Sequence, residues 1–319
     1  MIGQRKRRAA HGARRLLLSC AVAAACALSL WTVAPVSAQA QGAAHHDRFE
    51  SERSDKLTGG KIERAEFEPG QPDINLTLNV PSFRLTLWQN GREVRSYWIG
   101  VGMKDYPIYI GEREANEVIW NPAWIPPASE WVSSHKGVSP GEIIKASDPR
   151  NPLGKLKIPL GDGYLIHQAA KTTDPGNLVS HGCVRVLRTD LYDLAEKITA
   201  ARSLPVTRRQ IALAKAGTKQ LLIPLDTPLP VEVHYDTLVV EDGTLHVYPD
   251  VYDRRMNTVQ RLRDELVSSG ANLSRVDDET LRQILAQVSK RGTQFVVDVS
   301  SIESGRALED GRTAPVIPT

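Results

Sequence analysis

The sequence predicts a mainly β fold, a mixed β-sandwich or barrel-like domain with a few peripheral helices, followed by a small α+β extension. From Ile74 to Trp120, apolar residues alternate with polar ones at a period of two, which is the spacing of half-buried strands. The same stretch has no apolar pattern of helical period. A segment rich in proline and glycine follows, and only after Arg185 does the period become helical. We therefore expect a sheet to form the core of the first domain.

The first strands are expected to form a meander. Residues 74–80 and 83–89 alternate, and the Asn90-Gly91 pair after them is a strong hairpin signal because both residues tolerate positive φ. Residues 94–100 fit the return strand, and further strands are expected at 106–111 and 117–120.

Residues 120–163 are rich in proline, glycine and tryptophan and are expected to hold a long loop, with strands at 155–160 and 163–167. Its prolines lack an N–H and restrict the preceding residue, which excludes a helix. Trp124 and Trp131 either line a substrate groove or pack as core aromatics beneath the loop.

Helices are expected after residue 187. Leu191, Leu194, Ala195 and Ile198 form an apolar stripe, with Thr189 or Asp190 as N-cap. Further helices are expected at 208–219, 257–269 and 277–290, and further strands at 231–235, 238–240, 245–248 and 295–299. The expected domains are a first domain at 73–207, an extension at 208–303 and a disordered tail at 304–319.

Residues 1–38 have the features of an export signal. Six basic residues and no acidic ones precede or enter an apolar run, and Val36-Ser37-Ala38 offers a small-residue cleavage site. The alternative is an uncleaved membrane anchor. Residues 39–72 are polar and aperiodic, which indicates a flexible linker. We expect an exported protein of the periplasm or cell envelope.

The charge balance gives no support to a nucleic-acid partner. The chain has 40 basic and 37 acidic residues and a formal net charge of +3. Because six of the basic residues lie in the first 38, the remainder has 34 basic against 37 acidic side chains. No basic field remains to attract phosphates.

Cysteine usage draws attention to one thiol. Of the three cysteines, Cys20 and Cys26 lie in the expected signal, so Cys183 would remain alone after cleavage. An unpaired thiol in an exported protein is exposed to oxidation unless it is used. Cys183 ends Ser180-His181-Gly182-Cys183, and His167 stands sixteen residues upstream at the end of an apolar run. Imidazoles beside a thiol predict an activated sulfur nucleophile.

Blander interpretations stay open for the same residues. A lone cysteine is often a buried small apolar residue, and a redox-sensing thiol is a further option, although no resolving cysteine accompanies it. His167, His181 and Cys183 could in principle bind zinc, but a fourth ligand at suitable spacing is missing.

With these residues in place, the sequence resembles the L,D-transpeptidase catalytic domain (YkuD-like) family. Its signature is a strand-end histidine, a spacer, and Ser/Thr-His-Gly-Cys followed closely by Arg or Asn. The resemblance covers roughly residues 73–207 and continues more loosely through Tyr252. Two features depart from the pattern: Gln168-Ala169 replaces a usual Gly-Thr, and residues 106–111 replace a Thr-Pro-x-Gly turn.

The resemblance implies roles for seven residues and no cofactor or metal. Cys183 would be the nucleophile, His167 the proton donor and acceptor, and the backbone at Gly182 an oxyanion site. His181 would shape the loop and its field, or be an ordinary loop histidine. Arg185 would bind the donor carboxylate, or form a salt bridge to Asp190 or Asp193. Ser180 and Trp124 complete the candidates for substrate binding, and Ser180 is also expected to hydrogen-bond within the turn.

The implied donor is a peptidoglycan tetrapeptide stem, cut before its terminal D-Ala to give a thioester. An amine of another stem would yield a 3→3 cross-link, and a lysine of an outer-membrane lipoprotein would tether that protein. Water would make the protein an L,D-carboxypeptidase or endopeptidase. A non-catalytic peptidoglycan-binding protein of the same fold is the remaining alternative. Carbapenem-type β-lactams are the implied inhibitors, and no nucleic acid is expected as a partner.

Overall fold

The computed structural model describes residues 74–133, 137–288 and 291–317. The expected export signal and linker, residues 1–38 and 39–72, lie outside these ranges. Within the described ranges, no helix is both long and apolar enough to cross a membrane.

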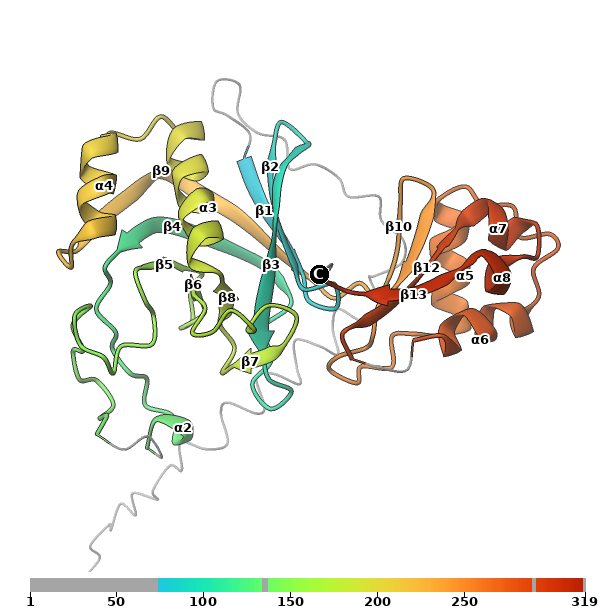
Figure 1. Ribbon diagram of the computed structural model, residues 1–319, viewed down its shortest axis with the longest axis horizontal. Coiled ribbons are helices and arrows are strands. Elements are labelled where there is room, and N and C mark those ends of the chain that lie inside the picture. Colours follow the sequence, from blue (N-terminus) through green and yellow to red (C-terminus); the bar gives the residue numbers. More distant parts are fainter. Residues whose placement is uncertain (1–73, 134–136, 289–290, 318–319) are drawn as a thin grey trace, which may run out of the picture. The chain divides into compact units, whose positions relative to one another are not determined.

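A closed sheet forms the first domain, as the alternating pattern predicted. In the described part of the chain, nine strands pair in the order β2-β1-β9-β4-β5-β6-β8-β3-β7 (Figure 1). A further pairing of β2 with β3 closes eight of them into a ring, with β7 attached to β3. The strands are β1 (Ile74–Asn79), β2 (Arg84–Gln89), β3 (Arg92–Gly102), β4 (Gly111–Trp120), β5 (Leu156–Pro159), β6 (Leu165–Gln168), β7 (Leu178–Ser180), β8 (Val184–Val186) and β9 (Leu221–His234).

The predicted hairpin is present, but one predicted strand is not. Gln89 pairs with Arg92 across the turn, whose central residues Asn90 and Gly91 both have positive φ. The strand expected at 106–111 is absent up to Gly111, the first residue of β4, because residues 103–106 form a turn and residues 107–110 are irregular. The Tyr106 N–H donates to the Met103 carbonyl at 3.0 Å.

The first domain is longer at its C-terminal end than the sequence indicated. Residues 208–234, assigned to the extension, hold β9, which pairs parallel to β1 and antiparallel to β4. Three prolines in β9 concealed its first half. Helices α2 (Glu130–Ser133), α3 (Arg188–Ala201) and α4 (Arg208–Ala216) complete the domain. The apolar stripe of α3 is buried as predicted, but its N-cap is Leu187, without a side-chain cap.

The extension has a core of its own around a four-stranded sheet. Its elements are β10 (Leu238–Glu241), β11 (Thr244–Val247), α5 (Val259–Ser268), α6 (Asp278–Ala286), β12 (Thr293–Asp298), α7 (Val299–Glu303), α8 (Ala307–Asp310) and β13 (Arg312–Pro315). The prediction of a disordered tail from residue 304 is therefore wrong, because β13 pairs along β12 and Val316 is 2% exposed.

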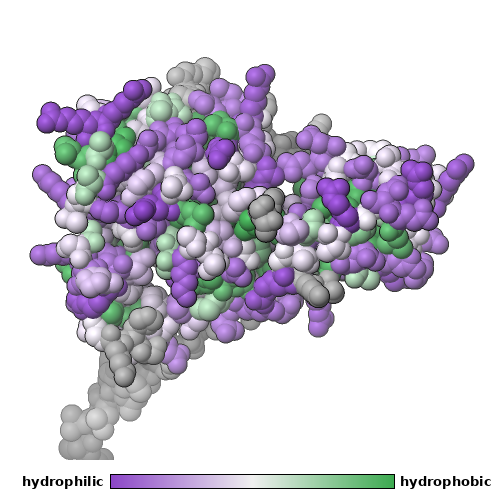
Figure 2. Space-filling view, in the orientation of Figure 1, coloured by the Kyte–Doolittle hydropathy of each residue, from purple (hydrophilic) through white to green (hydrophobic). Residues whose placement is uncertain are grey.

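The visible surface is mostly polar. Figure 2 shows apolar side chains only in small separate groups on the face drawn. Ile143 and Leu213 are among the most exposed of the described large apolar side chains, at 68% and 62%. Scattered exposure of this kind is ordinary for a soluble domain.

Candidate active site

Two neighbouring strands bring the predicted thiol and imidazole close together. β6 and β8 run parallel, with Ile166 opposite Val184 and His167 opposite Arg185. Ile166 and Val184 are fully buried in the main core, and side chains alternate between faces along a strand. His167 and Arg185 therefore lie on the opposite face. Cys183 directly precedes β8, and its thiol is hydrogen-bonded by the backbone of Leu165, two residues before His167 on β6.

Hydrogen bonds fix the backbone of the turn that carries Cys183, directly before β8. Ser180 is 2% exposed, and its hydroxyl donates to the Cys183 carbonyl at 2.5 Å. The Ser180 carbonyl accepts from the Met103 N–H at 2.9 Å. Gly182 has a φ of +105°, and a Cβ there would lie 2.9 Å from the Tyr164 ring, so only glycine fits. The predicted turn hydrogen bond of Ser180 is present, and its hydroxyl serves the turn.

Burial keeps the Cys183 thiol and the His167 imidazole uncharged near neutral pH. Burial raises the pKa of the Cys183 thiol, against a smaller lowering by the charge of Arg185. His167 is 4% exposed, and burial first and Arg185 second lower its pKa to about 4. The Gln168 backbone and Asp174 raise the His167 pKa by less. The Cys183 thiol is therefore protonated near neutral pH.

Arg185 has a partner that the sequence did not indicate. Its Nη1 lies 3.2 Å from Oδ2 of Asp174, and the two side chains are 20% and 5% exposed. The expected partners were Asp190 or Asp193, but Asp193 accepts instead from the Tyr97 hydroxyl at 2.8 Å. Arg185 is thus anchored from the loop between β6 and β7.

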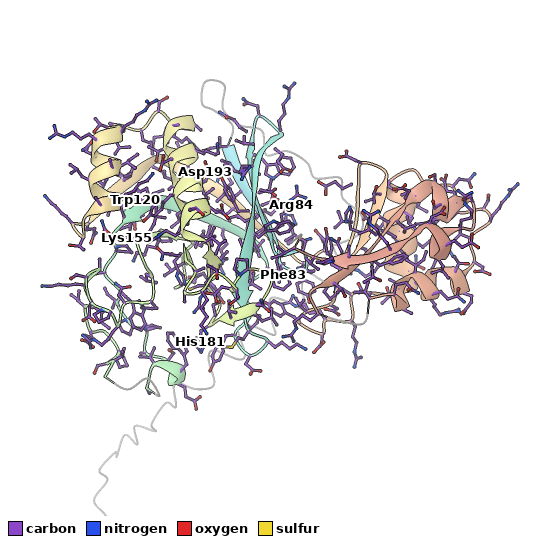
Figure 3. The ribbon with its side chains drawn as sticks, viewed as in Figure 1. Phe83, Arg84, Trp120, Lys155, His181 and Asp193 are labelled. Carbon is purple, nitrogen blue, oxygen red and sulfur yellow. The ribbon has the colours of Figure 1, made fainter. Side chains whose placement is uncertain are left out.

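His181 lies within an aromatic stack beside the turn, near β7 and α2 (Figure 3). Its ring stacks on Trp131 at 4.3 Å and meets the edge of Tyr106 at 4.7 Å. Trp124 lies 6.3 Å from Trp131 and is 7% exposed, so it packs as a core aromatic beneath the loop. Among the residues described, no three His, Cys, Asp or Glu side chains are arranged to hold a metal ion.

Comparison with known proteins identifies this arrangement. Residues 74–233, half of the chain, match a model of the L,D-transpeptidase catalytic domain family, YkuD. The chain belongs to this family.

Relatives within the family are distant. YbiS of Escherichia coli K12, a probable L,D-transpeptidase, is 29% identical over 126 residues, covering 39% of this chain and 41% of YbiS. The chain therefore spans about two fifths of that relative's length. An L,D-transpeptidase structure from Mycobacterium smegmatis is 11% identical, with a TM-score of 0.32 over 51% of this chain and 59% of its own. The structure of L,D-transpeptidase 3 of Mycobacterium tuberculosis in complex with a faropenem-derived adduct is 14% identical. Its TM-score is 0.31, over 51% of this chain and 60% of its own.

One departure from the L,D-transpeptidase pattern has a structural explanation. Gln168, in the place of the usual glycine, accepts from the Lys155 N–H through Oε1 at 3.1 Å. Its side chain packs against Gly154, where a Cβ would lie 2.6 Å away. Gln168 thereby ties the preceding turn to the strand of His167. The Nδ1 atom of His167 is buried and makes no hydrogen bond of standard geometry to a described residue.

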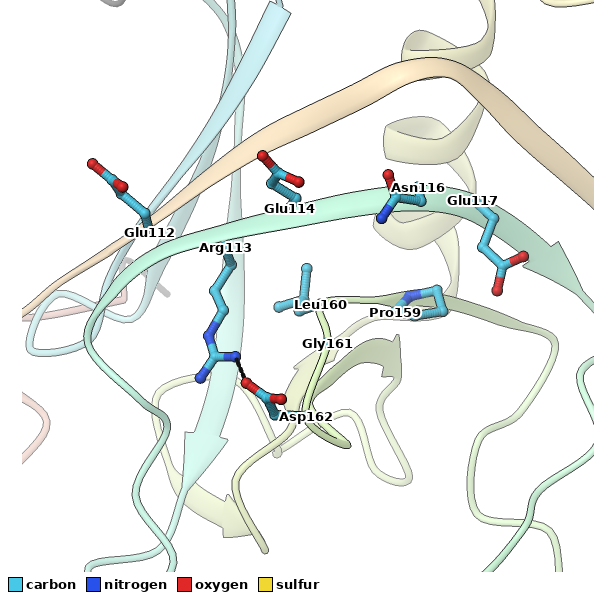
Figure 4. A pocket seen from close by; sticks show the side chains of 9 residues that line it. All are labelled: Glu112, Arg113, Glu114, Asn116, Glu117, Pro159, Leu160, Gly161 and Asp162. Carbon is cyan, nitrogen blue, oxygen red and sulfur yellow. Dashed lines mark hydrogen bonds and ion pairs between the residues drawn. The ribbon is translucent and has the colours of Figure 1, made fainter. Parts of the chain in front are cut away.

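Sequence reasoning missed the wall formed by Tyr164. This ring lies against Gly182, and its pKa is raised by burial and, to a smaller extent, by the nearby Cys183. Arg113 lies over the rings of Tyr109 and Tyr164, at 4.5 and 4.8 Å from their centroids. Its guanidinium also pairs with the Asp162 carboxylate at 2.6 Å (Figure 4). An open groove of about 590 Å³ beside them is also lined by three carboxylates, Glu112, Glu114 and Glu117. No local pattern links Arg113 to a tyrosine fifty residues later.

Tyr252 supports the opposite side of the turn. Its hydroxyl donates to the Gly102 carbonyl at 3.0 Å and accepts from the Ile108 N–H at 3.5 Å. A Cβ at Gly102 would lie 3.0 Å from the Gly182 Cα, so these two backbones touch. The loose resemblance through Tyr252 was the one sequence signal for this contact.

Proposed function

We propose that the chain is an L,D-transpeptidase that acts on peptidoglycan tetrapeptide stems through a thioester at Cys183. One observation carries the proposal: in a domain of this family, Cys183 lies directly before β8, and the buried His167 lies on β6, the strand that runs parallel to β8. A nucleophile and a base that are held on rigid strands need little reorganisation before reaction.

In the first half-reaction, the Cys183 thiol passes its proton to His167 as sulfur attacks the carbonyl carbon of stem residue three. A C–S bond forms, and the oxyanion faces the backbone N–H groups of Gly182 and Cys183, where losing one donor typically costs about 3 kcal/mol. The His167 imidazolium then gives this proton to the nitrogen of D-Ala. The C–N bond breaks, and a thioester remains. The low pKa of His167 favours this second transfer.

In the second half-reaction, an amine attacks the thioester carbonyl and loses its proton to His167. The C–S bond breaks, and the thiolate of Cys183 recovers the proton. A stem amine gives a 3→3 cross-link, and a lysine of an outer-membrane lipoprotein gives a tethered protein. We further propose that Arg185 contacts the donor carboxylate. Because the substrate lies outside the cytoplasm, the proposal includes export to the periplasm or cell envelope.

Intact-protein mass spectrometry with a carbapenem tests the acylation step. The wild-type chain is expected to gain one adduct, and Cys183→Ser to gain none. His167→Gln is expected to form the adduct roughly 10²–10⁴ times more slowly, the usual contribution of a general base. His246→Gln is the matched control, since this ring bonds Gln294 in the second sheet. An adduct on Cys183→Ser, or equal rates for both histidine variants, would overturn the assignment.

A muropeptide digest then identifies the acceptor. Incubation with tetrapeptide-bearing muropeptides is expected to yield 3→3 cross-links. Tripeptides without cross-links would favour the hydrolytic alternative, an L,D-carboxypeptidase or endopeptidase. A chain that binds muropeptides without changing them and forms no carbapenem adduct would be a binding protein, and the proposal would fail.

A further inference from the structure

Asp174 is a buried carboxylate for which the proposed mechanism has no use. It lies on the loop between β6 and β7 and is 4% exposed. Its Oδ2 accepts from the N–H groups of Ala170 and Lys171, at 2.8 and 3.3 Å, and from Arg185 at 3.2 Å. Burial of a carboxylate is costly unless charge and hydrogen bonds compensate it. The carboxylate is therefore tied to its own loop on one side and to a guanidinium on the other.

A glycine on β3 makes room for this loop. Gly100 is the register partner of Arg185, on the side away from β6. A Cβ at Gly100 would lie 2.6 Å from the Asp174 carbonyl oxygen. The Gly176 N–H also donates to the Ile99 carbonyl at 2.9 Å. The loop thus lies directly on β3, and this position brings the Asp174 carboxylate to Arg185.

Arg185 in turn stands beside His167. The two are direct register partners on β8 and β6, and Lys157 is the partner of His167 on β5. Burial lowers the pKa of Lys157, which Glu117 partly restores. Leu165, two residues before His167 on β6, packs against an apolar cluster of Trp124, Ile144 and Leu153. The charges that act on the His167 pKa are therefore Arg185, which lowers it, and Asp174, which raises it.

We propose that Asp174 is a positioning residue of the site, which holds the Arg185 guanidinium against the loop and offsets its positive charge beside His167. The proposal rests on the proposed function in taking His167 as the proton acceptor. An unpaired Arg185 guanidinium on the strand next to His167 would oppose the formation of an imidazolium. The pair thus leaves a cation available near the thiol while limiting its effect on the base.

Titration of His167 by NMR in the full chain tests the proposal. The spectra compare wild type, Asp174→Asn and the double variant Asp174→Asn/Arg185→Gln, with the His167 signal assigned by its loss in His167→Gln. Asparagine keeps the shape and can still accept from the Ala170 N–H. The expected order of His167 pKa is Asp174→Asn lowest, wild type next and the double variant highest, because Arg185 acts more strongly than Asp174. An Asp174 side chain without an electrostatic role would leave the His167 pKa unchanged in Asp174→Asn.

The rate of carbapenem adduct formation at pH 7 is the second readout. Asp174→Asn is expected to slow it roughly tenfold, less than the loss of the base itself. An Asp174→Asn variant with a His167 pKa equal to or above wild type would overturn the proposal. If that variant does not fold, Arg185→Gln is compared with the double variant: the single variant keeps the Asp174 charge and is expected to have the higher His167 pKa, and equal values in these two would overturn the proposal. Absence of any adduct on wild type, with the expected order of pKa values, would refute the proposed function and leave the electrostatic role of Asp174 standing.

Discussion

Acidification should destabilise this protein through one buried side chain. His167 is 4% exposed, and its pKa falls from 6.5 to about 4 on folding, chiefly because of burial. The folded state binds a proton at His167 more weakly than the unfolded chain does. Protonation at low pH therefore favours the unfolded chain. The stabilisation is therefore complete above pH 6.5 and is lost as the pH falls toward 4. A shift of this size corresponds to about 3 kcal/mol, a large part of the stability of an ordinary domain.

Urea unfolding at several values between pH 7 and pH 4.5 measures this contribution in wild type, His167→Gln and Cys183→Ala. Other titrating groups act alike in all three, so the difference in unfolding free energy isolates His167. The advantage of wild type over His167→Gln is expected to shrink by about 3 kcal/mol as the pH approaches 4. Cys183→Ala should follow wild type, because burial raises the thiol pKa above this window. A constant gap between wild type and His167→Gln would refute the reasoning.

Three substitutions test the supports of the site. Gly102→Ala would bring a Cβ against the Tyr106 carbonyl oxygen, so we expect a loss of about 1–3 kcal/mol in urea unfolding and slower carbapenem adduct formation; a wild-type rate would contradict the close packing. Tyr252→Phe removes the hydrogen bond to the Gly102 carbonyl, so the unfolding free energy should fall by about 1 kcal/mol and carbapenem adduct formation should slow. Unchanged values would show that this hydrogen bond contributes neither to stability nor to the reaction. Gln168→Ala removes the acceptor of the Lys155 N–H and should lower the thermal midpoint without abolishing the adduct, and complete loss of the adduct would show that Gln168 acts in the chemistry.

Local patterns were sufficient to predict much of the first domain. The Asn90-Gly91 turn fixes a hairpin by its own backbone preference, and the structure has that hairpin between β2 and β3. The stripe on residues 191–198 predicted the buried face of α3 for a similar reason, since a helix repeats its contacts every few residues. The turn at 180–183 also follows from its residues, because Gly182 alone accepts the positive φ there.

The errors lie where distant segments decide the structure. β9 belongs to the first sheet because it pairs with β1, about 150 residues earlier, and its prolines concealed the first half of the strand. The tail is ordered because β13 adds to the edge of β12, which its own polar residues do not reveal. The prediction of Thr189 or Asp190 as the N-cap of α3 is wrong because the helix begins earlier, at Arg188, and its N-cap is Leu187, directly after β8. Each case depends on a partner that a single stretch of sequence does not contain.

The sequence by itself predicted the candidate reacting groups. Ser180-His181-Gly182-Cys183 and the strand-end His167 predict a thiol nucleophile with a base, because side-chain chemistry and short turns are local properties. Only the tertiary structure decided the environment of these groups. It buried His167, paired Arg185 with Asp174 and brought Tyr252 to the Gly102 carbonyl. Burial and charge pairing depend on which distant surfaces pack together, and this packing sets the proton affinity of the imidazole and the thiol.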